Sequence, residues 1–283
     1  MHSLLTINIR GHLMDFRQPK VMGIVNVTPD SFYSGSRTPG DSEILGRVLQ
    51  LRNEEADIVD LGGYSTRPGA SDVTADEEYS RLARALEILK REWEEVPVSI
   101  DTFRADVARR CIEEWGVDII NDISGGTIDP EIWNVVAEKR AVYVLTHTRG
   151  TPSDMQTLTD YDDVTADVIT DLSKKVYELR GLGVNDIIID PGFGFAKTRE
   201  QNFQILNELG EFCKMGMPVL AGLSRKSMIW KTLGVTPEES YEGTVALDAI
   251  ALDRGADILR VHDVKAARQT VKLLSNLNTL HHD

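Results

Sequence analysis

The chain has 283 residues, and its 45 Asp and Glu against 31 Lys and Arg give it a formal charge of −14. A hydrophobic fraction of 41% and a charged fraction of 27% are typical of a globular protein with a large core, which excludes a mainly disordered chain. The acidic charge argues against nucleic acid as a partner, and no apolar run reaches the ~18 to 20 residues of a membrane span. Cys111 and Cys213 lie far apart without a metal-binding spacing, which excludes a disulfide scaffold; with no secretory pattern at the start, we expect a cytoplasmic protein.

The chain alternates short apolar runs with longer amphipathic stretches. Before the first run, residues 4–16 indicate a hairpin with its turn at Arg10-Gly11, placed to cover one end of the fold. Eight runs predict strands: Val21–Val27, Ile58–Leu61, Val96–Ile100, Ile119–Ile123, Val142–Leu145, Ile187–Ile189, Val219–Ala221 and Ile258–Val261. Eight stretches predict helices: Ser42–Glu55, Glu77–Glu92, Arg104–Trp115, Pro130–Lys139, Val164–Leu182, Arg199–Cys213, Pro237–Arg254 and Val264–Leu277. Eight strand-then-helix units predict an α/β fold, a (β/α)₈ TIM barrel, as a single domain over residues 20–280 after an N-terminal hairpin segment over residues 1–19.

A polar side chain follows each predicted strand. In chain order these residues are Asn26, Asp60, Asp101, Asn121, Asp122, His147, Asp190, Ser224, Arg225, Lys226, Arg260 and His262. One polar residue after one strand usually only begins a loop or caps a turn. Because all eight strands of a barrel end at the same rim, eight such positions in succession instead predict one shared polar pocket.

The polar residues fall into two chemical sets. Asp101, Asn121, Asp190 and Lys226 combine donors and acceptors that suit a flat heterocycle with several N–H groups and a carbonyl. The second set suits an anionic group such as a phosphate, and it consists of Asn26, Ser65, Thr66, Arg67, Arg260 and His262. Ser227 is expected to open a helix whose N-terminus favours a carboxylate. A site for a heterocycle, a phosphate and a carboxylate indicates a transferase.

Seven segments make the sequence recognisable: Gly23–Phe32, Asp60–Gly69, Ser99–Thr102, Asn121–Gly126, Asp190–Thr198, Gly222–Ser227 and Arg260–Val264. In this order, from about Val21 to Val264, they resemble the dihydropteroate synthase family of pterin-binding enzymes. The resemblance implies a TIM barrel. It also implies condensation of (7,8-dihydropterin-6-yl)methyl diphosphate with 4-aminobenzoate to dihydropteroate and diphosphate, in folate biosynthesis.

The resemblance assigns roles to individual residues. Those that look like the pterin-binding set are Asp101, Asn121, Asp190 and Lys226. Asn26, Arg260 and His262 look like the diphosphate-binding set, with Asn26 also contacting the Mg²⁺ cofactor. Those that look like the 4-aminobenzoate-binding set are Thr66, Arg67, Pro68, Phe195 and Ser227. The family further implies inhibition by sulfonamides and a homodimer.

The chain departs from the usual family pattern at four places. Ser34 stands where many members have an Asp that is thought to assist cation formation, and Tyr64 stands where Glu is common. Thr146 replaces a Met that often packs on the pterin, and Trp230 replaces a small residue. The change at Ser34 keeps open the possibility of a catalytically silent pterin-binding paralogue.

Two kinds of enzyme with related folds are also compatible with a barrel of this size. A methyltetrahydrofolate:corrinoid methyltransferase-like barrel shares the pterin residues but lacks the Ser65–Pro68 and Ser224–Ser227 segments together. A metal-dependent hydrolase places His-x-His after the first strand, where this chain has Asn26-Val27-Thr28. Both comparisons favour the synthase.

Overall fold

The computed structural model describes residues 5–28, 40–64, 73–151 and 153–279. Strands β1 (Thr6–Ile9) and β2 (His12–Asp15) pair antiparallel as a hairpin. Eight strands then form a second sheet: β3 (Lys20–Asn26), β4 (Ile58–Gly62), β5 (Val98–Asp101), β6 (Ile119–Asp122), β7 (Val142–Thr146), β8 (Ile187–Asp190), β9 (Leu220–Ala221) and β10 (Ile258–Val261). The helices are α1 (Asp41–Asn53), α2 (Ala75–Glu92), α3 (Ala105–Trp115), α4 (Glu131–Lys139), α5 (Val164–Gly181), α6 (Arg199–Asn207), α7 (Leu209–Cys213), α8 (Ser227–Leu233), α9 (Tyr241–Asp253) and α10 (Val264–Thr279).

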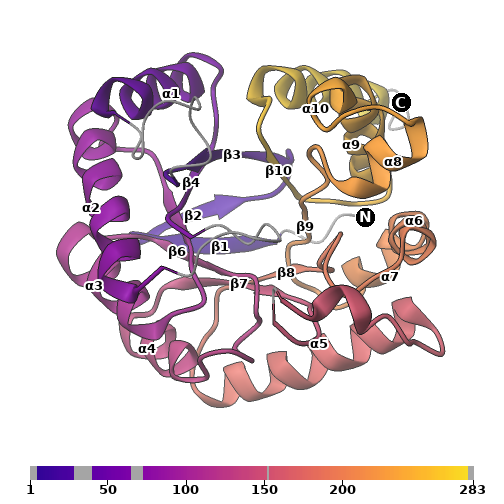
Figure 1. Ribbon diagram of the computed structural model, residues 1–283, viewed down its shortest axis with the longest axis horizontal. Helices are drawn as coiled ribbons and strands as arrows, with labels where there is room; N and C mark the ends of the chain where they lie inside the picture. The colour runs from indigo at the N-terminus through magenta and orange to yellow at the C-terminus, as the bar shows by residue number, and fades with distance from the viewer. Residues whose placement is uncertain (1–4, 29–39, 65–72, 152, 280–283) are drawn as a thin grey trace.

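The second sheet is parallel and curls into a nearly closed barrel. Its strand order is β8-β7-β6-β5-β4-β3-β10-β9, and a parallel bridge between Ile189 of β8 and Val219 next to β9 joins the two ends. The helices surround the strands (Figure 1). The predicted TIM barrel with an N-terminal hairpin is therefore confirmed.

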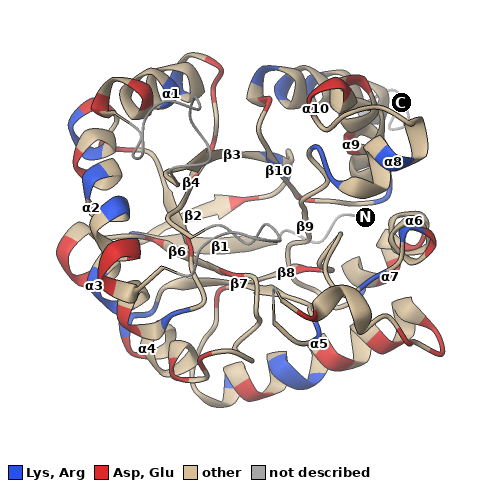
Figure 2. Cartoon of the chain, in the orientation of Figure 1, with Lys and Arg blue, Asp and Glu red and all other residues tan. Residues whose placement is uncertain are grey.

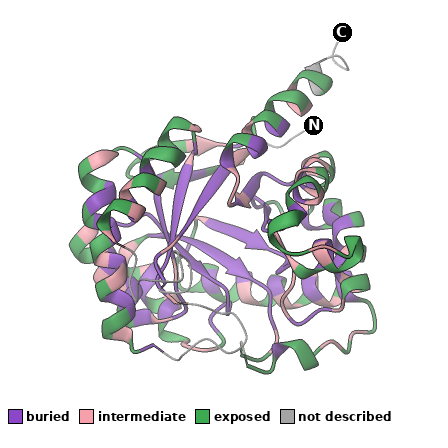
Figure 3. Cartoon of the chain, turned by 45° about the horizontal axis from the view of Figure 1, so that its top comes forward, coloured by how far each residue is buried: buried purple, intermediate pink, exposed green. Residues whose placement is uncertain are grey.

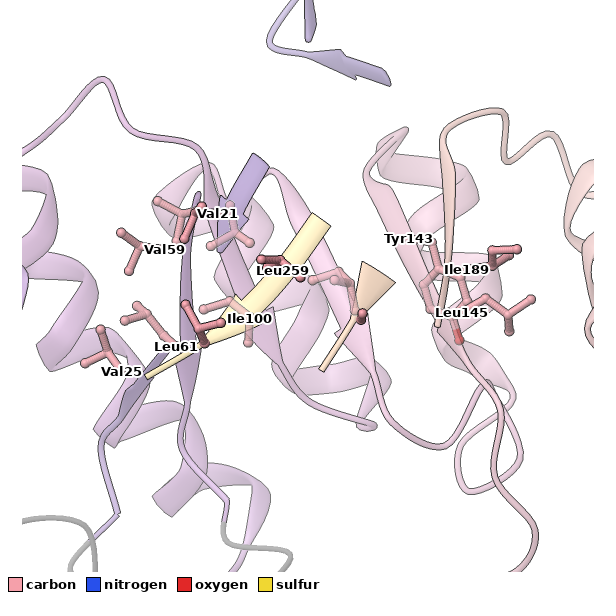
Figure 4. Close-up of a cluster of buried hydrophobic side chains, with 14 of the residues drawn as sticks. Val21, Val25, Val59, Leu61, Ile100, Tyr143, Leu145, Ile189 and Leu259 are labelled. Carbon is pink, nitrogen blue, oxygen red and sulfur yellow. The ribbon is translucent and has the colours of Figure 1, made fainter. Parts of the chain in front are cut away.

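Alternate residues along each strand build two separate cores. One set points outward and packs under the helices; Figure 4 shows part of it, including Val59, Leu61 and Ile100. The other set fills the barrel interior, and its strand residues are Met22, Ile58, Ile119, Val142, Val144, Ile188, Leu220 and Ile258. Figure 3 shows the result, in which the strands are buried and the helices bury one face and expose the other.

The hairpin closes the amino end of the barrel. Ile7, Ile9 and Phe16 are buried in the same cluster as the interior strand residues. Arg10 donates to both carboxylate oxygens of Asp118, just before β6, at 2.8 Å each. The expected position of the hairpin is thus correct, and the carboxyl ends of the strands are left as the open end.

Several predicted boundaries differ from the structure. The stretch Arg199–Cys213 forms two helices, because the backbone leaves helical geometry at Glu208 (φ −105°, ψ 18°). β5 begins at Val98 rather than Val96, since Pro97 has no N–H for a strand ladder. Helix α8 was absent from the eight predicted helices, although it begins at Ser227 as expected.

The surface has an ordinary distribution of charge. Figure 2 shows Lys, Arg, Asp and Glu mainly on the outer helices, while the strands are largely uncharged. Of the helices in the described ranges, none is long and apolar enough to cross a membrane.

Candidate active site

A polar layer lies directly above the apolar interior, at the carboxyl ends of the strands. Side chains two residues apart in a strand share a face, so an inward apolar residue is followed two positions later by an inward polar one. The pairs are Ile58 and Asp60, Ile119 and Asn121, Ile188 and Asp190, and Ile258 and Arg260. In TIM barrels this rim is where active sites lie.

Arg260 is the centre of this polar layer. Its Nε lies 2.7 Å from Oδ2 of Asp60, and its Nη2 lies 2.6 Å from Oδ2 of Asp101. Asn121 donates from Nδ2 to the same Oδ2 of Asp60 at 3.2 Å, which adds a fourth strand to the network. The Asp60 side chain is completely buried, and its Oδ1 has no hydrogen-bond partner among the described residues. The network therefore fixes the guanidinium and the amide in one orientation.

The charges of this network keep Arg260 protonated. Burial alone lowers its pKa, but the carboxylates of Asp60 and Asp101 outweigh burial and raise it. Burial also raises the pKa of Asp101, and the Arg260 cation opposes that shift. Arg260 bonds these carboxylates through Nε and Nη2, and its Nη1 has no partner among the residues that the structure describes, so the Nη1 donors can meet an anionic ligand.

Asp190, at the end of β8, and Lys226, in the segment after the neighbouring β9, interact electrostatically. Oδ1 of Asp190 accepts from the backbone N–H of Gly192 at 2.7 Å, which leaves Oδ2 for a ligand. Burial raises the pKa of Asp190, and Lys226 is the main opposing influence. Burial likewise lowers the pKa of Lys226 to about 8, against the attraction of Asp190 and Asp101. The two acids and the lysine thus share one desolvated space.

Lys226 also links this set to the residues predicted for 4-aminobenzoate. Its Nζ donates to the backbone carbonyl of Phe193 and lies 4.2 Å from the centroid of the Phe195 ring. Ser227 follows it as the exposed first residue of α8. The predictions for Thr66, Arg67 and Pro68, and the departure at Ser34, fall outside the described residues.

The residues predicted for the anion lie at the ends of β3 and β10. In the strand register Asn26 is opposite Gly62, which is opposite Asp101. A Cβ atom on Gly62 would lie 3.4 Å from Oδ1 of Asn26 and 3.8 Å from Cβ of Asp101. Both side chains therefore border the space above Gly62.

His262 is held in a neutral state at this edge. Its Nδ1 lies 2.9 Å from Oγ of Ser224. Burial and the nearby Arg260 lower the pKa of His262 to about 4, so the ring is uncharged at neutral pH. A neutral ring offers an anion a hydrogen bond, while Arg260 provides the charge.

A metal site made only of protein ligands is not present in the described part of the chain, where no cluster of three or more His, Cys, Asp or Glu has metal-binding geometry. Mg²⁺ is usually bound by one or two protein oxygens together with substrate phosphates and water. The amide oxygen of Asn26 at the rim fits that pattern of donors.

Two residues of the site were not among the predicted site residues. Asp60 was noted only as the end of a strand, yet it bonds both Arg260 and Asn121. Its signal in the sequence is its place two residues after Ile58, which puts it inside the barrel. Lys197 lies buried in the same loop as Phe195, and only its burial in the structure distinguishes it from a surface lysine.

Comparison with known proteins agrees with this geometry. Residues 22–262 match the model of the family described as pterin binding enzyme. The chain belongs to this family. It is 44% identical over 260 residues to the dihydropteroate synthase of Synechocystis sp., covering 91% of this chain and 89% of that protein. It is 40% identical to the dihydropteroate synthase of Bacillus subtilis, covering 93% and 90%. The resemblance stated from the sequence is confirmed.

Solved structures of dihydropteroate synthases superpose on almost the whole chain. The Xanthomonas albilineans enzyme with 4-aminobenzoic acid has a TM-score of 0.89 at 37% identity and covers 98% of this chain and 99% of its own. The Yersinia pestis enzyme with a sulfonamide drug has a TM-score of 0.91 at 34% identity and covers 98% and 100%. The Xanthomonas enzyme with 7,8-dihydropteroate has a TM-score of 0.85 at 34% identity and covers 96% and 98%.

Proposed function

We propose that this chain is a dihydropteroate synthase, which condenses (7,8-dihydropterin-6-yl)methyl diphosphate with 4-aminobenzoate to 7,8-dihydropteroate and diphosphate in folate biosynthesis. The observation that carries the proposal is the set of buried Asp190 and half-buried Asp101 and Lys226 beside Arg260, in a chain 44% identical to a dihydropteroate synthase. A silent paralogue would have no reason to retain both the heterocycle set and the anion set in one pocket.

The pterin ring is assigned to the desolvated space between β5, β6 and β8. Oδ2 of Asp190 accepts from the N–H groups on one edge of the ring, since Oδ1 is engaged by Gly192. Asn121 and Asp101 meet its other polar edge, and Lys226 donates to the ring carbonyl or nitrogen. Charge-assisted bonds to a carboxylate are about twice as strong as neutral ones, so Asp190 contributes most to selectivity.

The diphosphate is assigned to Arg260, His262 and Asn26. The Nη1 donors of Arg260 and the neutral ring of His262 bind its oxygens. The neutral amide oxygen of Asn26 is the protein group that would hold Mg²⁺, and the diphosphate would supply anionic oxygen ligands. When bound, Mg²⁺ neutralises charge on the leaving diphosphate.

The reaction needs no side-chain nucleophile. The bond between the pterin methylene carbon and the diphosphate oxygen breaks, and its electron pair leaves with the diphosphate. Nitrogen lone pairs of the reduced pterin delocalise the resulting cation. The amine nitrogen of 4-aminobenzoate then bonds the methylene carbon and loses a proton to solvent or to the departing diphosphate. The protein's residues orient both substrates, stabilise charge and exclude water.

The 4-aminobenzoate is assigned to Thr66, Arg67, Pro68, Phe195 and Ser227. Phe195 lies beside Lys226, so a benzoate ring stacked on Phe195 has its amine next to the pterin. Sulfonamides present a similar ring and amine, and we propose that they compete for this place.

We also propose that the protein forms a homodimer, as the family resemblance implies. The hairpin segment 1–19 and the barrel domain 20–280 remain our predicted division of the chain, and a cytoplasmic location remains a prediction.

The proposed function is tested by diphosphate release from purified protein with Mg²⁺, measured with both substrates and with each omitted. We expect release, and dihydropteroate by mass spectrometry, only with both substrates. Release without 4-aminobenzoate at the same rate would indicate a diphosphatase and would refute the synthase.

A further inference from the structure

The loop after β8 carries residues of both predicted substrate sites and has an unusual backbone. Asp190 lies at its start and Phe195 lies five residues later. Three of the residues between Asp190 and Lys197 have left-handed φ angles: Gly192 at 74°, Gly194 at 82° and Ala196 at 49°. A left-handed φ angle is rare at a residue other than glycine, and at Ala196 it costs free energy. Such a loop therefore persists only where surrounding groups hold it.

Side chains hold the loop's carbonyl groups one by one. Lys226 donates to the carbonyl of Phe193, Gln156 to that of Gly194, and Tyr161 to that of Ala196. Two further carbonyls of the loop, those of Gly192 and Phe195, are both bound by one group. That group is the ammonium of Lys197, with each distance 3.0 Å. The carbonyl of Gly192 also accepts from the backbone N–H of Phe195 at 3.1 Å.

Lys197 is buried and donates only to neutral acceptors. Its residue is 4% exposed, and its third contact is Nδ1 of His147 at 3.0 Å. Burial, together with the charge of Lys197, lowers the pKa of His147 to about 2, so the ring is neutral. Because an ammonium can only donate, Nδ1 is the acceptor of this bond. The three N–H donors of the ammonium are therefore matched by three acceptors, and within the described part of the chain this lysine bonds no carboxylate.

The surroundings make this ammonium costly to retain. Burial is the main influence and lowers the pKa of Lys197 to about 7, with Lys226 and Arg149 acting in the same direction. Asp190 on β8 and Asp171 on α5 oppose the shift. A buried lysine without a direct counter-ion is rare in proteins, and its retention here suggests a task that a neutral side chain does not perform.

We propose that Lys197 is a positioning residue for 4-aminobenzoate: its ammonium gathers the carbonyls of Gly192 and Phe195 and thereby fixes the Phe195 ring against Lys226. The proposal rests on the proposed function, and it adds a residue that touches neither substrate. The pterin side depends less on this ammonium, because Asp190 is held within β8 and by the Gly192 N–H.

The test uses the expected difference between the two substrates, because 4-aminobenzoate binding should depend on Lys197 more than pterin binding does. In Lys197→Met, which keeps the length and removes the donors, we expect the KM for 4-aminobenzoate to rise at least about tenfold. The Kd for pterin diphosphate, from calorimetry, is expected to change less than about threefold, and the inhibition constant of a sulfonamide is expected to rise with the KM. Lys174→Met, at an exposed position on α5, is the matched control and is expected to leave all these constants unchanged.

A merely structural role gives a different result. If Lys197→Met lowers kcat through a smaller active fraction but leaves both substrate constants at their wild-type values, the proposal is wrong. An equal loss for pterin diphosphate and 4-aminobenzoate also overturns it. Should the Met variant fail to fold, His147→Leu removes one acceptor of the ammonium and is expected to raise the 4-aminobenzoate KM alone; no change there refutes the proposal. Failure of the proposed function is distinguishable, because then the wild-type protein itself forms no dihydropteroate.

Discussion

Arg260→Met removes the cation that lies between two carboxylates of the barrel rim. In the structure Arg260 bonds Asp60 at 2.7 Å and Asp101 at 2.6 Å, and the Asp60 side chain is completely buried. Removing one partner of a buried ion pair costs about 3 to 5 kcal/mol, because the remaining charge is left without compensation. For a chain of this size that loss corresponds to a fall in Tm of roughly 6 to 20 °C, at about 2 to 4 °C for each kcal/mol.

The loss of stability in Arg260→Met should depend on pH. The pKa values of the carboxyl groups decide whether the loss is larger at high or at low pH. Burial already raises the pKa of Asp101, and loss of Arg260 removes the influence that opposes this. A carboxyl whose pKa is higher in the folded than in the unfolded protein destabilises the fold where it must ionise, and this penalty disappears as the pH falls through the raised pKa. The difference in Tm between wild type and variant should therefore be largest near about pH 8 and smaller near about pH 5.5.

Thermal unfolding at several pH values measures this difference, and the double variant Arg260→Met with Asp60→Asn is the control. Asparagine has the shape of Asp60 without its charge, so the double variant should regain most of the lost stability. The reasoning is refuted if the single variant loses the same stability at every pH, or if the double variant is no more stable than the single one.

Three further predictions concern the site and the barrel floor. In Asp190→Asn, the side-chain oxygen must stay toward the Gly192 N–H, which turns the amide donor toward the pterin. We therefore expect pterin affinity to fall at least about tenfold, equivalent to roughly 1.4 kcal/mol or more. A titration that gives wild-type affinity would contradict this. Ser227→Tyr adds bulk beside the predicted 4-aminobenzoate site, so a sulfonamide's inhibition constant should rise more than the 4-aminobenzoate KM; equal changes in the two constants would contradict it. Ile7→Ala leaves a cavity under the barrel, since Ile7 is 1% exposed. The free energy of unfolding in urea should fall by about 2 to 5 kcal/mol, with neither KM changed. A variant as stable as wild type would mean that the hairpin does not contribute to the hydrophobic core.

Most of the barrel could be predicted from the sequence because each strand-then-helix unit is formed by residues that are close together along the chain. The apolar runs that begin at Ile58, Ile119 and Ile258 start at the same residues as strands β4, β6 and β10. A helix was expected to begin at Ser227, but the extent of α8 was not predicted, since it has only 7 residues and packs against α6 and α9, which lie elsewhere in the chain. Length and periodicity are weak signals for so short a helix.

The rim was predicted as a set of residues, but not as a network. Asp101, Asn121, Asp190 and Arg260 were assigned from their positions after strands, and the structure brings them to one end of the barrel. Which oxygen bonds which nitrogen depends on strand register across the barrel. No pattern along the chain specifies that register, so Asp60 was overlooked as a partner of Arg260.

Local charge, and not the net charge of the chain, governs whether this acidic protein can bind a diphosphate. The formal charge of −14 comes from the whole sequence, and many of its acidic residues lie on exposed helix faces, where solvent and salt screen them. At the rim, three acidic groups, Asp60, Asp101 and Asp190, are matched in number by three basic groups, Arg260, Lys226 and Lys197. The acids orient these groups and oppose the effect of burial on their pKa values, and for Arg260 they outweigh it, so that its guanidinium stays protonated where the anion arrives. A fixed arrangement of balanced charges can therefore bind an anionic leaving group without a basic surface.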